Sequence, residues 1–215
     1  ALISAVVSGV LIFTLLPDNS NVFWAVISGL LAGVLIGFFT EYYTSDSYKP
    51  TKKLASSSET GSATIIIDGI ALGMNSTAIP VIIIGVSVII SFFTAGGAGS
   101  FASGLYGVGL SAVGMLATLG ITLATDAYGP VADNAGGIAE MSGMPDQVRS
   151  ITDKLDAVGN TTAAIGKGFC IGSAALTSLA FIVSFIEAVK VHVPTFSISL
   201  SDPCVLVGLL IGAML

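Results

Sequence analysis

Charged side chains are scarce in this sequence of 215 residues. They make up 9% of it, against roughly 25% in ordinary soluble domains, while hydrophobic residues make up 53%. This shortage excludes a soluble globular protein. The net charge of −6 excludes the basic surface that nucleic-acid binding needs. The two cysteines, Cys170 and Cys204, lack the spacing of a metal site, and we expect neither a disulfide nor a metal-binding role for them.

Long apolar runs are what the sequence has in place of charge. A helix that spans a bilayer needs about 20 mostly apolar residues, and six stretches approach or reach this length: 1–16, 22–39, 64–93, 103–125, 165–189 and 205–215. None alternates in polarity as a membrane β-strand would. We therefore expect an all-α, polytopic transmembrane helix bundle. Because the chain begins and stops inside apolar runs, we expect residues 1–215 to form one membrane-domain fragment with a partial helix at each end.

The basic residues fall on alternate connections between these stretches. Residues 40–63 carry three of the seven, residues 126–167 carry three more, and the connections 17–21 and 94–102 carry none. Short cytoplasmic loops of membrane proteins collect Lys and Arg. We therefore expect a cytoplasmic loop at 40–63 and a cytoplasmic segment at 126–167, with six crossings of an integral membrane protein.

Glycines recur at helical spacing in three of the stretches. They stand four residues apart in three sets, which are Gly29 with Gly33 and Gly37, Gly168 with Gly172, and Gly208 with Gly212. Small residues at this spacing let helix backbones approach closely in lipid, where no hydrophobic force draws helices together. The pattern predicts tight helix packing at each set.

Carboxylates recur every seven residues beyond the fourth apolar stretch, at Asp126, Asp133 and Glu140. If the helix continues, seven residues make just under two turns, with about 20° of drift per step. The three carboxylates would then form one stripe with about 10 Å between neighbours. Charges near membrane depth are placed toward a bundle interior, a partner or water. Each carboxylate could therefore meet a different part of a site that holds several ions.

A second polar pair, Asn160 and Lys167, has the same spacing just before the fifth apolar stretch. Magnesium is usually bound by one or two carboxylates together with phosphate oxygens and water, and a lysine supplies a point charge for phosphate. The two sets together suit magnesium with an anionic phosphate compound. The open alternative is a solvated helix extension, above all for Glu140, Asp146, Asp153 and Asp156. Asp146, after a proline, is expected to cap a helix N-terminus.

Four blocks of the sequence resemble the membrane-integral, ion-translocating pyrophosphatases. They are TDAYGPVADNAGGIAEM at 125–141, ITDKLDAVGNTTAAIGKGFCIG at 151–172, FTEYYTS at 39–45 and ETGSATIIIDGIALGMNSTAIPV at 59–81. The resemblance implies that about six helices here belong to a larger fold of sixteen, in a homodimer embedded in the lipid bilayer. It further implies hydrolysis of magnesium pyrophosphate at a cytoplasmic site, coupled to outward movement of H⁺ or Na⁺.

The resemblance also implies roles for single residues. Asp133 matches a magnesium-binding aspartate, and Asn160 matches a neighbouring metal contact. Asp126 and Lys167 match an acidic position and a lysine of the active-site region. No catalytic base is identified in the chain, and other acidic and lysine motifs of the family have no counterpart in it. We therefore expect residues 1–215 alone to be inactive.

Two further positions indicate whether the protein needs potassium. Family members that do not need potassium resemble GNTTK where this chain has GNTTA at 159–163, and they carry a different residue in place of Gly166. Ala163 and Gly166 therefore resemble the potassium-dependent type, since a fixed lysine ammonium can replace a bound monovalent cation. The expected cofactors are thus Mg²⁺ and K⁺.

The residues alone leave a competing interpretation, a secondary cation transporter or channel that does not hydrolyse anything. Such a protein would use membrane carboxylates as ion sites, and its composition and glycine spacing would be the same. The block from Asn160 to Lys167 favours the pyrophosphatase, because a cation pathway has no clear need for it.

Overall fold

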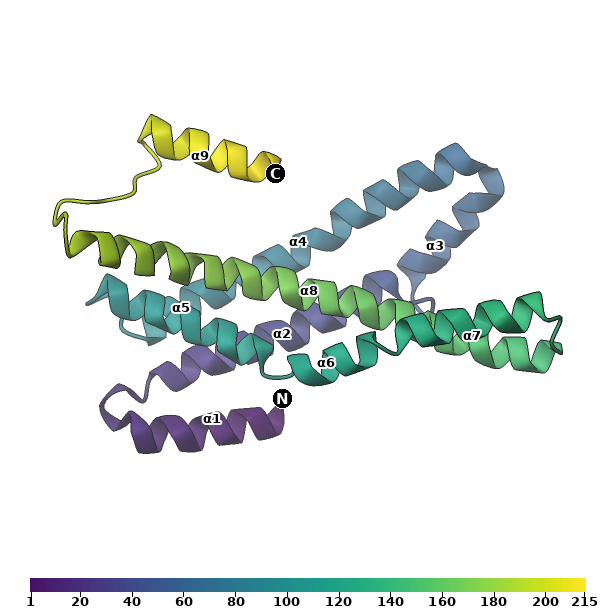
Figure 1. Cartoon of the computed structure of the whole chain (residues 1–215), viewed down its shortest axis with the longest axis horizontal. Coiled ribbons are helices and arrows are strands. Elements are labelled where there is room, and N and C mark those ends of the chain that lie inside the picture. Colours follow the sequence, from purple (N-terminus) through teal and green to yellow (C-terminus); the bar gives the residue numbers. More distant parts are fainter.

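Figure 1 shows a computed structural model of the chain, which describes all 215 residues. The elements are α1 (Leu2–Leu15), α2 (Val22–Thr44), α3 (Lys49–Ser57), α4 (Ser62–Thr94), α5 (Phe101–Leu116), α6 (Leu119–Asp126), α7 (Gly129–Met141), α8 (Asp146–Lys190) and α9 (Pro203–Met214), with short 3₁₀ turns at Pro17–Asn19 and Ser58–Thr60. There is no β-strand. The prediction of an all-α fold is confirmed.

Each of the six predicted stretches is helical, but not all are long enough to span a bilayer. Helices α2, α4 and α8 are long and apolar enough, and α5 with α6 and α7 makes a fourth candidate that is bent by 42°. Helices α1 and α9 are shorter, with 14 and 12 residues. The structure therefore holds three or four full spans and two short apolar helices.

The connections between helices gather at two sides of the molecule (Figure 1). The α2–α3, α3–α4 and α7–α8 connections lie toward the right of the view, and the α1–α2, α4–α5 and α8–α9 connections lie toward the left. The first group belongs to the segments 40–63 and 126–167, which carry six of the seven basic residues, and the seventh, Lys190, ends α8 beside the second group. Residues 40–63 are not a plain loop, however, because α2 continues to Thr44 and α3 occupies Lys49–Ser57.

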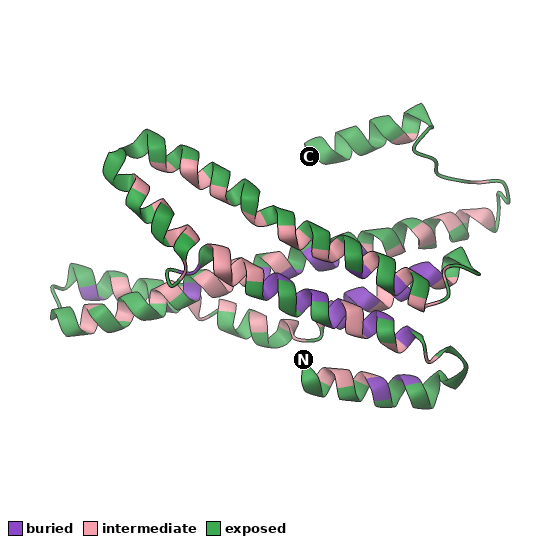
Figure 2. Cartoon of the chain, turned by 180° about the vertical axis from the view of Figure 1, so that it is seen from behind, coloured by how far each residue is buried: buried purple, intermediate pink, exposed green.

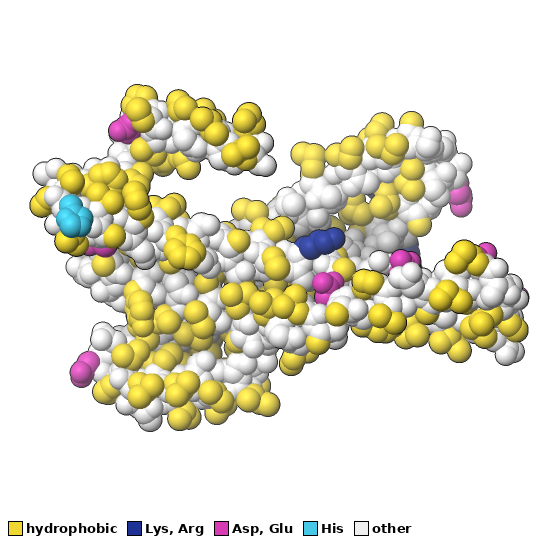
Figure 3. Space-filling model, in the orientation of Figure 1, with side chains coloured by type: hydrophobic (Ala, Val, Ile, Leu, Met, Phe, Trp, Pro, Cys, Tyr) yellow, Lys and Arg dark blue, Asp and Glu magenta, His cyan; other side chains and the backbone are white.

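The buried core lies where α2, α5 and α8 cross. Its members are Ala32, Ile36, Val108, Ala112, Met115, Phe169 and Leu176, and Figure 2 shows buried residues concentrated along this crossing. Many large hydrophobic side chains are exposed elsewhere, and the face in Figure 3 shows many hydrophobic and few charged side chains. Such surfaces suit contact with lipid or with further membrane helices rather than with water.

Helices α2 and α5 approach each other backbone to backbone. A Cβ atom on Gly29 would lie 1.8 Å from the carbonyl oxygen of Ser111, and one on Gly114 would lie 2.2 Å from the carbonyl oxygen of Val26. Both distances are far below van der Waals contact. Neither position can therefore accept a side chain unless the helices move apart.

The predicted packing at the other glycines is confirmed for two of the three sets. Added Cβ atoms on Gly33 and Gly37 would contact Phe169 of α8, and those on Gly168 and Gly172 would contact Ile36 of α2. In α9, by contrast, nothing lies within 4 Å of such an atom on Gly208 or Gly212. The packing predicted for that pair is not made within this chain.

Four serines join α4 to this crossing. The Ser28 and Ser87 hydroxyl oxygens are 2.9 Å apart, and those of Ser87 and Ser111 are 3.0 Å apart. Ser91 donates to the carbonyl oxygen of Ser87 at 2.6 Å. Hydrogen bonds between membrane helices contribute about 0.6 kcal/mol each on average. The cluster thus links α2, α4 and α5 through hydroxyl groups that lipid could not satisfy.

We predict that Gly29→Ala destabilises the full-length protein. The added methyl group would overlap the Ser111 carbonyl, and overpacking of this kind costs about 1–3 kcal/mol in the free energy of unfolding. The measurement is the thermal unfolding midpoint of the purified protein in detergent. Gly85→Ala is the matched control, because nothing lies within 4 Å of that position. Equal midpoints for the two variants would contradict the prediction.

Candidate functional site

The carboxylate stripe predicted at Asp126, Asp133 and Glu140 does not lie on one continuous helix. Helix α6 ends at Asp126 and α7 begins at Gly129. Pro130 stands at the start of α7, and because proline has no N–H, the Asp126 carbonyl loses the hydrogen bond that a continuing helix would give it. The continuous helix on which the predicted stripe depended is therefore not formed.

Helices α6 and α7 run antiparallel to the first part of α8 and contact it at regular intervals. The close contacts are seven residues apart on each side and pair Thr122 with Gly166, Gly129 with Gly159, and Gly136 with Thr152. The middle contact is the tightest, since a Cβ atom on Gly159 would lie 2.7 Å from the Cα atom of Gly129. This register places Asp126 level with Thr162 and Ala163, and Asp133 level with Leu155 and Asp156.

An acidic depression of about 340 Å³ lies between α7 and α8. It is lined by Asp133, Gly136, Gly137, Glu140, Arg149, Asp153 and Asp156. Arg149 forms ion pairs with Glu140 and, at 3.3 Å, with Asp153. Asp133 and Asp156 have no basic partner. Two carboxylates therefore face the same depression with their charges uncompensated.

The donor set of this depression fits part of a magnesium site. Asp156 accepts a hydrogen bond from the Asn160 amide at 3.2 Å, so an amide adjoins the two free carboxylates. No three His, Cys, Asp or Glu side chains come close enough to hold a metal ion by themselves. Magnesium is commonly held by only one or two carboxylates, with substrate phosphates and water as the other ligands. The residues present are compatible with such a shared site.

The structure brings together only some of the predicted site residues. Asp133 lines the depression and Asn160 adjoins it through Asp156. Asp126 is half-buried and outside the lining, and Lys167 is exposed with no ion pair. Lys167 stands eleven residues beyond Asp156 on α8, which is about 16 Å along the helix axis.

Ala163 and Gly166, the two residues predicted to determine potassium dependence, lie between Asp156 and Lys167 on α8. Ala163 is half-buried and next to the level of Asp126, and Gly166 is buried against the methyl group of Thr122.

Asp146 makes no capping hydrogen bond, because α8 already begins at Asp146 and Pro145 occupies the N-cap position. The N-cap prediction for Asp146 is therefore wrong.

The length of α8 explains how the depression is reached from water. Its 45 residues extend about 68 Å, more than twice the roughly 30 Å of a hydrocarbon core. The apolar part of the helix begins at Ile165, so the residues before it extend about 28 Å farther. The α7–α8 hairpin with its acidic depression therefore projects beyond the apolar region, while Lys167 lies near its boundary.

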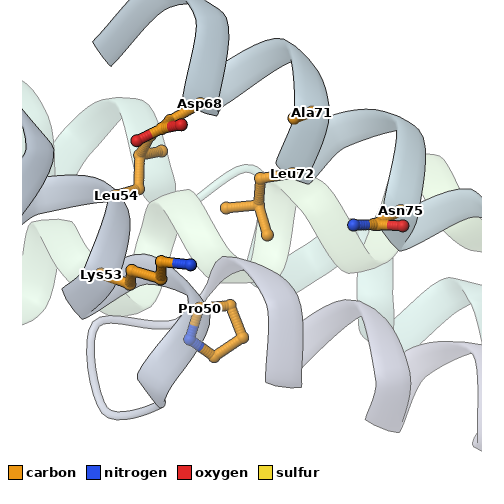
Figure 4. A pocket seen from close by; sticks show the side chains of 7 residues that line it. All are labelled: Pro50, Lys53, Leu54, Asp68, Ala71, Leu72 and Asn75. Atoms are coloured by element: carbon orange, nitrogen blue, oxygen red, sulfur yellow. The ribbon is translucent and has the colours of Figure 1, made fainter. Parts of the chain in front are cut away.

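A second depression lies between α3 and α4 (Figure 4). Lys53 and Asp68 approach it from the two helices, and Asn75 lies farther along α4. No ion pair joins Lys53 to Asp68. This depression is separate from the carboxylates of α7 and α8.

Comparison with known proteins identifies the family. The sequence profile of the family described as "Inorganic H+ pyrophosphatase" matches residues 1–215. This chain belongs to that pyrophosphatase family. It is thus part of an integral membrane protein, as its apolar helices also indicate.

Relatives within the pyrophosphatase family differ in their named ion and in their response to potassium. A Clostridium tetani protein is 54% identical to this chain, and the match covers 99% of this chain and 31% of the relative. A Bacteroides thetaiotaomicron protein is 63% identical, and the match covers 78% of this chain and 23% of the relative. Both carry the name of a K⁺-stimulated pyrophosphate-energized sodium pump. A Methanosarcina mazei protein, named a K⁺-insensitive pyrophosphate-energized proton pump, is 47% identical, and the match covers 93% of this chain and 30% of the relative. The chain spans less than a third of the length of these relatives.

Sequence reasoning did not single out Arg149, although it decides which carboxylates are free. Arg149 and Asp153 are four residues apart on one helix, a spacing typical of ion pairs, so that pair was detectable. The Glu140 pair was not, because it depends on how α7 folds back on α8. The folded structure is therefore needed to tell the carboxylates that Arg149 neutralises, Glu140 and Asp153, from those without a basic partner, Asp133 and Asp156.

We predict that Arg149→Met makes the stability of the full-length protein more dependent on magnesium. Its loss removes two partly exposed ion pairs, worth together about 0.5–2 kcal/mol, and leaves four carboxylates unneutralised around the depression. The thermal midpoint should fall without divalent cations and recover with Mg²⁺. Lys154→Met is the control, because Lys154 forms no ion pair. The same midpoints and Mg²⁺ responses for both variants would overturn the prediction.

Proposed function

We propose that this chain forms the magnesium-binding and part of the phosphate-binding region of a membrane pyrophosphatase. The full-length protein hydrolyses magnesium pyrophosphate to two phosphates and couples this reaction to outward pumping of H⁺ or Na⁺. The observation that carries the proposal is the pair of unpartnered carboxylates, Asp133 and Asp156, which face one depression beyond the apolar part of α8.

Each residue of the site has a distinct task in this proposal. Asp133 and Asp156 hold Mg²⁺, and Asn160 orients Asp156 through their hydrogen bond and adjoins the metal. Lys167 offers its ammonium group to a phosphate oxygen, since it has no carboxylate partner in the chain. When bound, the metal supplies charge neutralisation at the phosphate oxygens and at the leaving phosphate.

The reaction needs little covalent chemistry from these residues. Water attacks one phosphorus atom, the bond to the bridging oxygen breaks, and the leaving phosphate carries away the electron pair. Catalysis of such transfers depends mostly on positioning and on electrostatic stabilisation. The chain contributes positioning through the α7–α8 register, and the base that activates the water belongs to the rest of the full-length protein.

The position of the basic residues supports a cytoplasmic site. Six of the seven lie at 40–63 and 126–167, and these segments share one side of the helix arrangement (Figure 1). The positive-inside rule assigns that side to the cytoplasm. The names of the relatives include both sodium and proton pumps, so the proposal covers either ion. It includes a homodimer, as the family resemblance implies.

Potassium stimulation is the more specific part of the proposal. The relatives named as K⁺-stimulated are 54% and 63% identical to this chain, against 47% for the K⁺-insensitive relative from Methanosarcina mazei. In the structure, Asp126 stands level with Thr162 and Ala163 across the α6–α8 contact. A cation beside Ala163 would therefore have a carboxylate nearby, and so would a lysine ammonium at that position.

The first test is release of phosphate from pyrophosphate by membranes that contain the full-length protein. We predict Mg²⁺-dependent release, and a loss of at least about 10-fold in Asp133→Asn, because loss of a residue that supports a bound metal ion commonly costs about 10–100-fold in metal affinity or activity. Asp146→Asn is the control, since Asp146 lies outside the depression and should leave the rate nearly unchanged. Release that is independent of Mg²⁺, or unaffected by Asp133→Asn, would contradict the proposed hydrolysis.

The second test addresses potassium. We predict that K⁺ raises the hydrolysis rate of the unmodified full-length protein and that Ala163→Lys keeps a high rate without added K⁺, because the ammonium group takes the place of the bound cation. Ala163→Met, which adds similar length without charge, should keep the dependence on K⁺. A rate of the unmodified protein that does not respond to K⁺ would contradict the assignment of Ala163.

A further inference from the structure

The depression between α3 and α4 contains charges of both signs that do not pair with each other. Its polar lining residues are Lys53 of α3 and Asp68 and Asn75 of α4 (Figure 4), and its volume is about 150 Å³. Asp68 is half-buried, and neither Lys53 nor Asp68 forms an ion pair. A charge that is taken out of water without a partner is unfavourable. The depression therefore offers an ammonium group and a carboxylate to an occupant.

The length of α4 places this depression at the level of lipid headgroups. The helix has 33 residues and extends about 50 Å, whereas the hydrocarbon core of a bilayer is about 30 Å thick. Counted back from the end of the helix at Thr94, 30 Å corresponds to about 20 residues, so the boundary of the core falls near Asn75. Asp68 lies about 10 Å beyond it along the helix axis. The span from Asn75 to Asp68 thus matches the headgroup region, which adds roughly 5–8 Å on each side of the core.

Three tyrosines beside the α3–α4 depression support the same level. The ring of Tyr42 lies 5.2 Å from that of Tyr43 and 5.4 Å from that of Tyr48, between ring centroids. Tyr43 also lines a neighbouring depression together with Leu54 of α3 and Leu72 of α4. Tyrosine and tryptophan gather at the two interfaces between a membrane and water. The aromatic cluster therefore indicates an interfacial position for this end of the molecule.

The charges of the depression select a ligand that carries both signs. A free anion would be attracted by Lys53 and repelled by Asp68, and a free cation would meet the reverse. A phospholipid headgroup with a phosphate and a primary ammonium would pair with both residues, and its ammonium could also donate to the side-chain oxygen of Asn75. Lys49 and Lys52 are exposed on α3 outside the lining, so they add only a general attraction for anionic lipids.

An apolar surface leads from the depression toward the hydrocarbon core. Leu54 and Leu72 form part of its walls. The face of α4 that carries Asp68 and Asn75 continues at seven-residue spacing to Ile82, whose side chain is 65% exposed. Acyl chains attached to a headgroup in the depression would lie along this face.

We propose that the α3–α4 depression binds the headgroup of a phospholipid with a primary ammonium group, the chemistry of phosphatidylethanolamine. Lys53 pairs with a phosphate oxygen, and Asp68 accepts hydrogen bonds from the lipid ammonium. The site is separate from the carboxylates of α7 and α8, so it does not depend on whether the full-length protein hydrolyses pyrophosphate.

The test is lipid retention by the full-length protein, measured by native mass spectrometry after purification in detergent. The protein is incubated with equal amounts of phosphatidylethanolamine, phosphatidylcholine and phosphatidylglycerol with the same acyl chains. Phosphatidylcholine keeps the positive charge but has no N–H group, and phosphatidylglycerol has no amine. The variants are Lys53→Met and Asp68→Asn. Their controls are Lys52→Met and Glu59→Gln, which change exposed residues outside the depression.

We expect the unmodified protein to retain phosphatidylethanolamine about 2- to 5-fold more than either other lipid, the range of one exposed ion pair. Asp68→Asn should abolish the preference for phosphatidylethanolamine over phosphatidylglycerol, because the partner of the ammonium is lost. Lys53→Met should lower the retention of all three lipids, because each carries the phosphate. Lys52→Met and Glu59→Gln should keep the preference of the unmodified protein.

Equal retention of the three lipids by the unmodified protein would overturn the proposal, and this arm needs no variant. A preference for phosphatidylethanolamine that persists in Asp68→Asn would also overturn it, because the lipid would then be bound elsewhere. Retention that falls equally in Lys53→Met and Lys52→Met would show a general attraction to lysines rather than a site in the depression.

Discussion

The contact between the α2 and α5 backbones is the constraint on which the rest of the structure depends. Lipid cannot supply the hydrophobic force that assembles soluble cores, so helices in membranes are held by close packing and interhelical hydrogen bonds. Gly29 and Gly114 allow this packing because each faces a carbonyl oxygen of the other helix. With α2 and α5 fixed, α8 packs through Phe169 and Leu176, and α4 is joined by the serine cluster.

Helix α8 connects the buried core to the acidic depression. Helix α8 is buried at Phe169 and exposed at Asn160, so one rigid element links the membrane core to the projecting hairpin. The contacts of α6 and α7 with α8 repeat every seven residues, which fixes the level of each carboxylate relative to α8. The position of Asp133 beside Asp156 therefore follows from a packing register rather than from a loop.

Much of this arrangement could be predicted from the sequence, because the signals are local. Apolar length indicated the helices, and the glycine spacing around Gly33 and Gly168 indicated real contacts. Pro130 is a local signal too, because a proline interrupts the helix on which the carboxylate stripe depends. The pairing of Arg149 with Glu140 and the isolation of Gly208 depend on how distant segments meet, which no local pattern encodes. The roles of Asp126, Asp133, Asn160 and Lys167 stay predictions.

The interruption at Pro130 changes what Asp126 can offer to its surroundings. A residue inside a continuous helix presents only its side chain, since its main-chain carbonyl is bound to the next turn. At the end of α6 the carbonyl of Asp126 is released, and the end of a helix carries partial negative charge. One residue therefore provides two different oxygens and a helix dipole at the level of Ala163, and a proline four residues away is the cause.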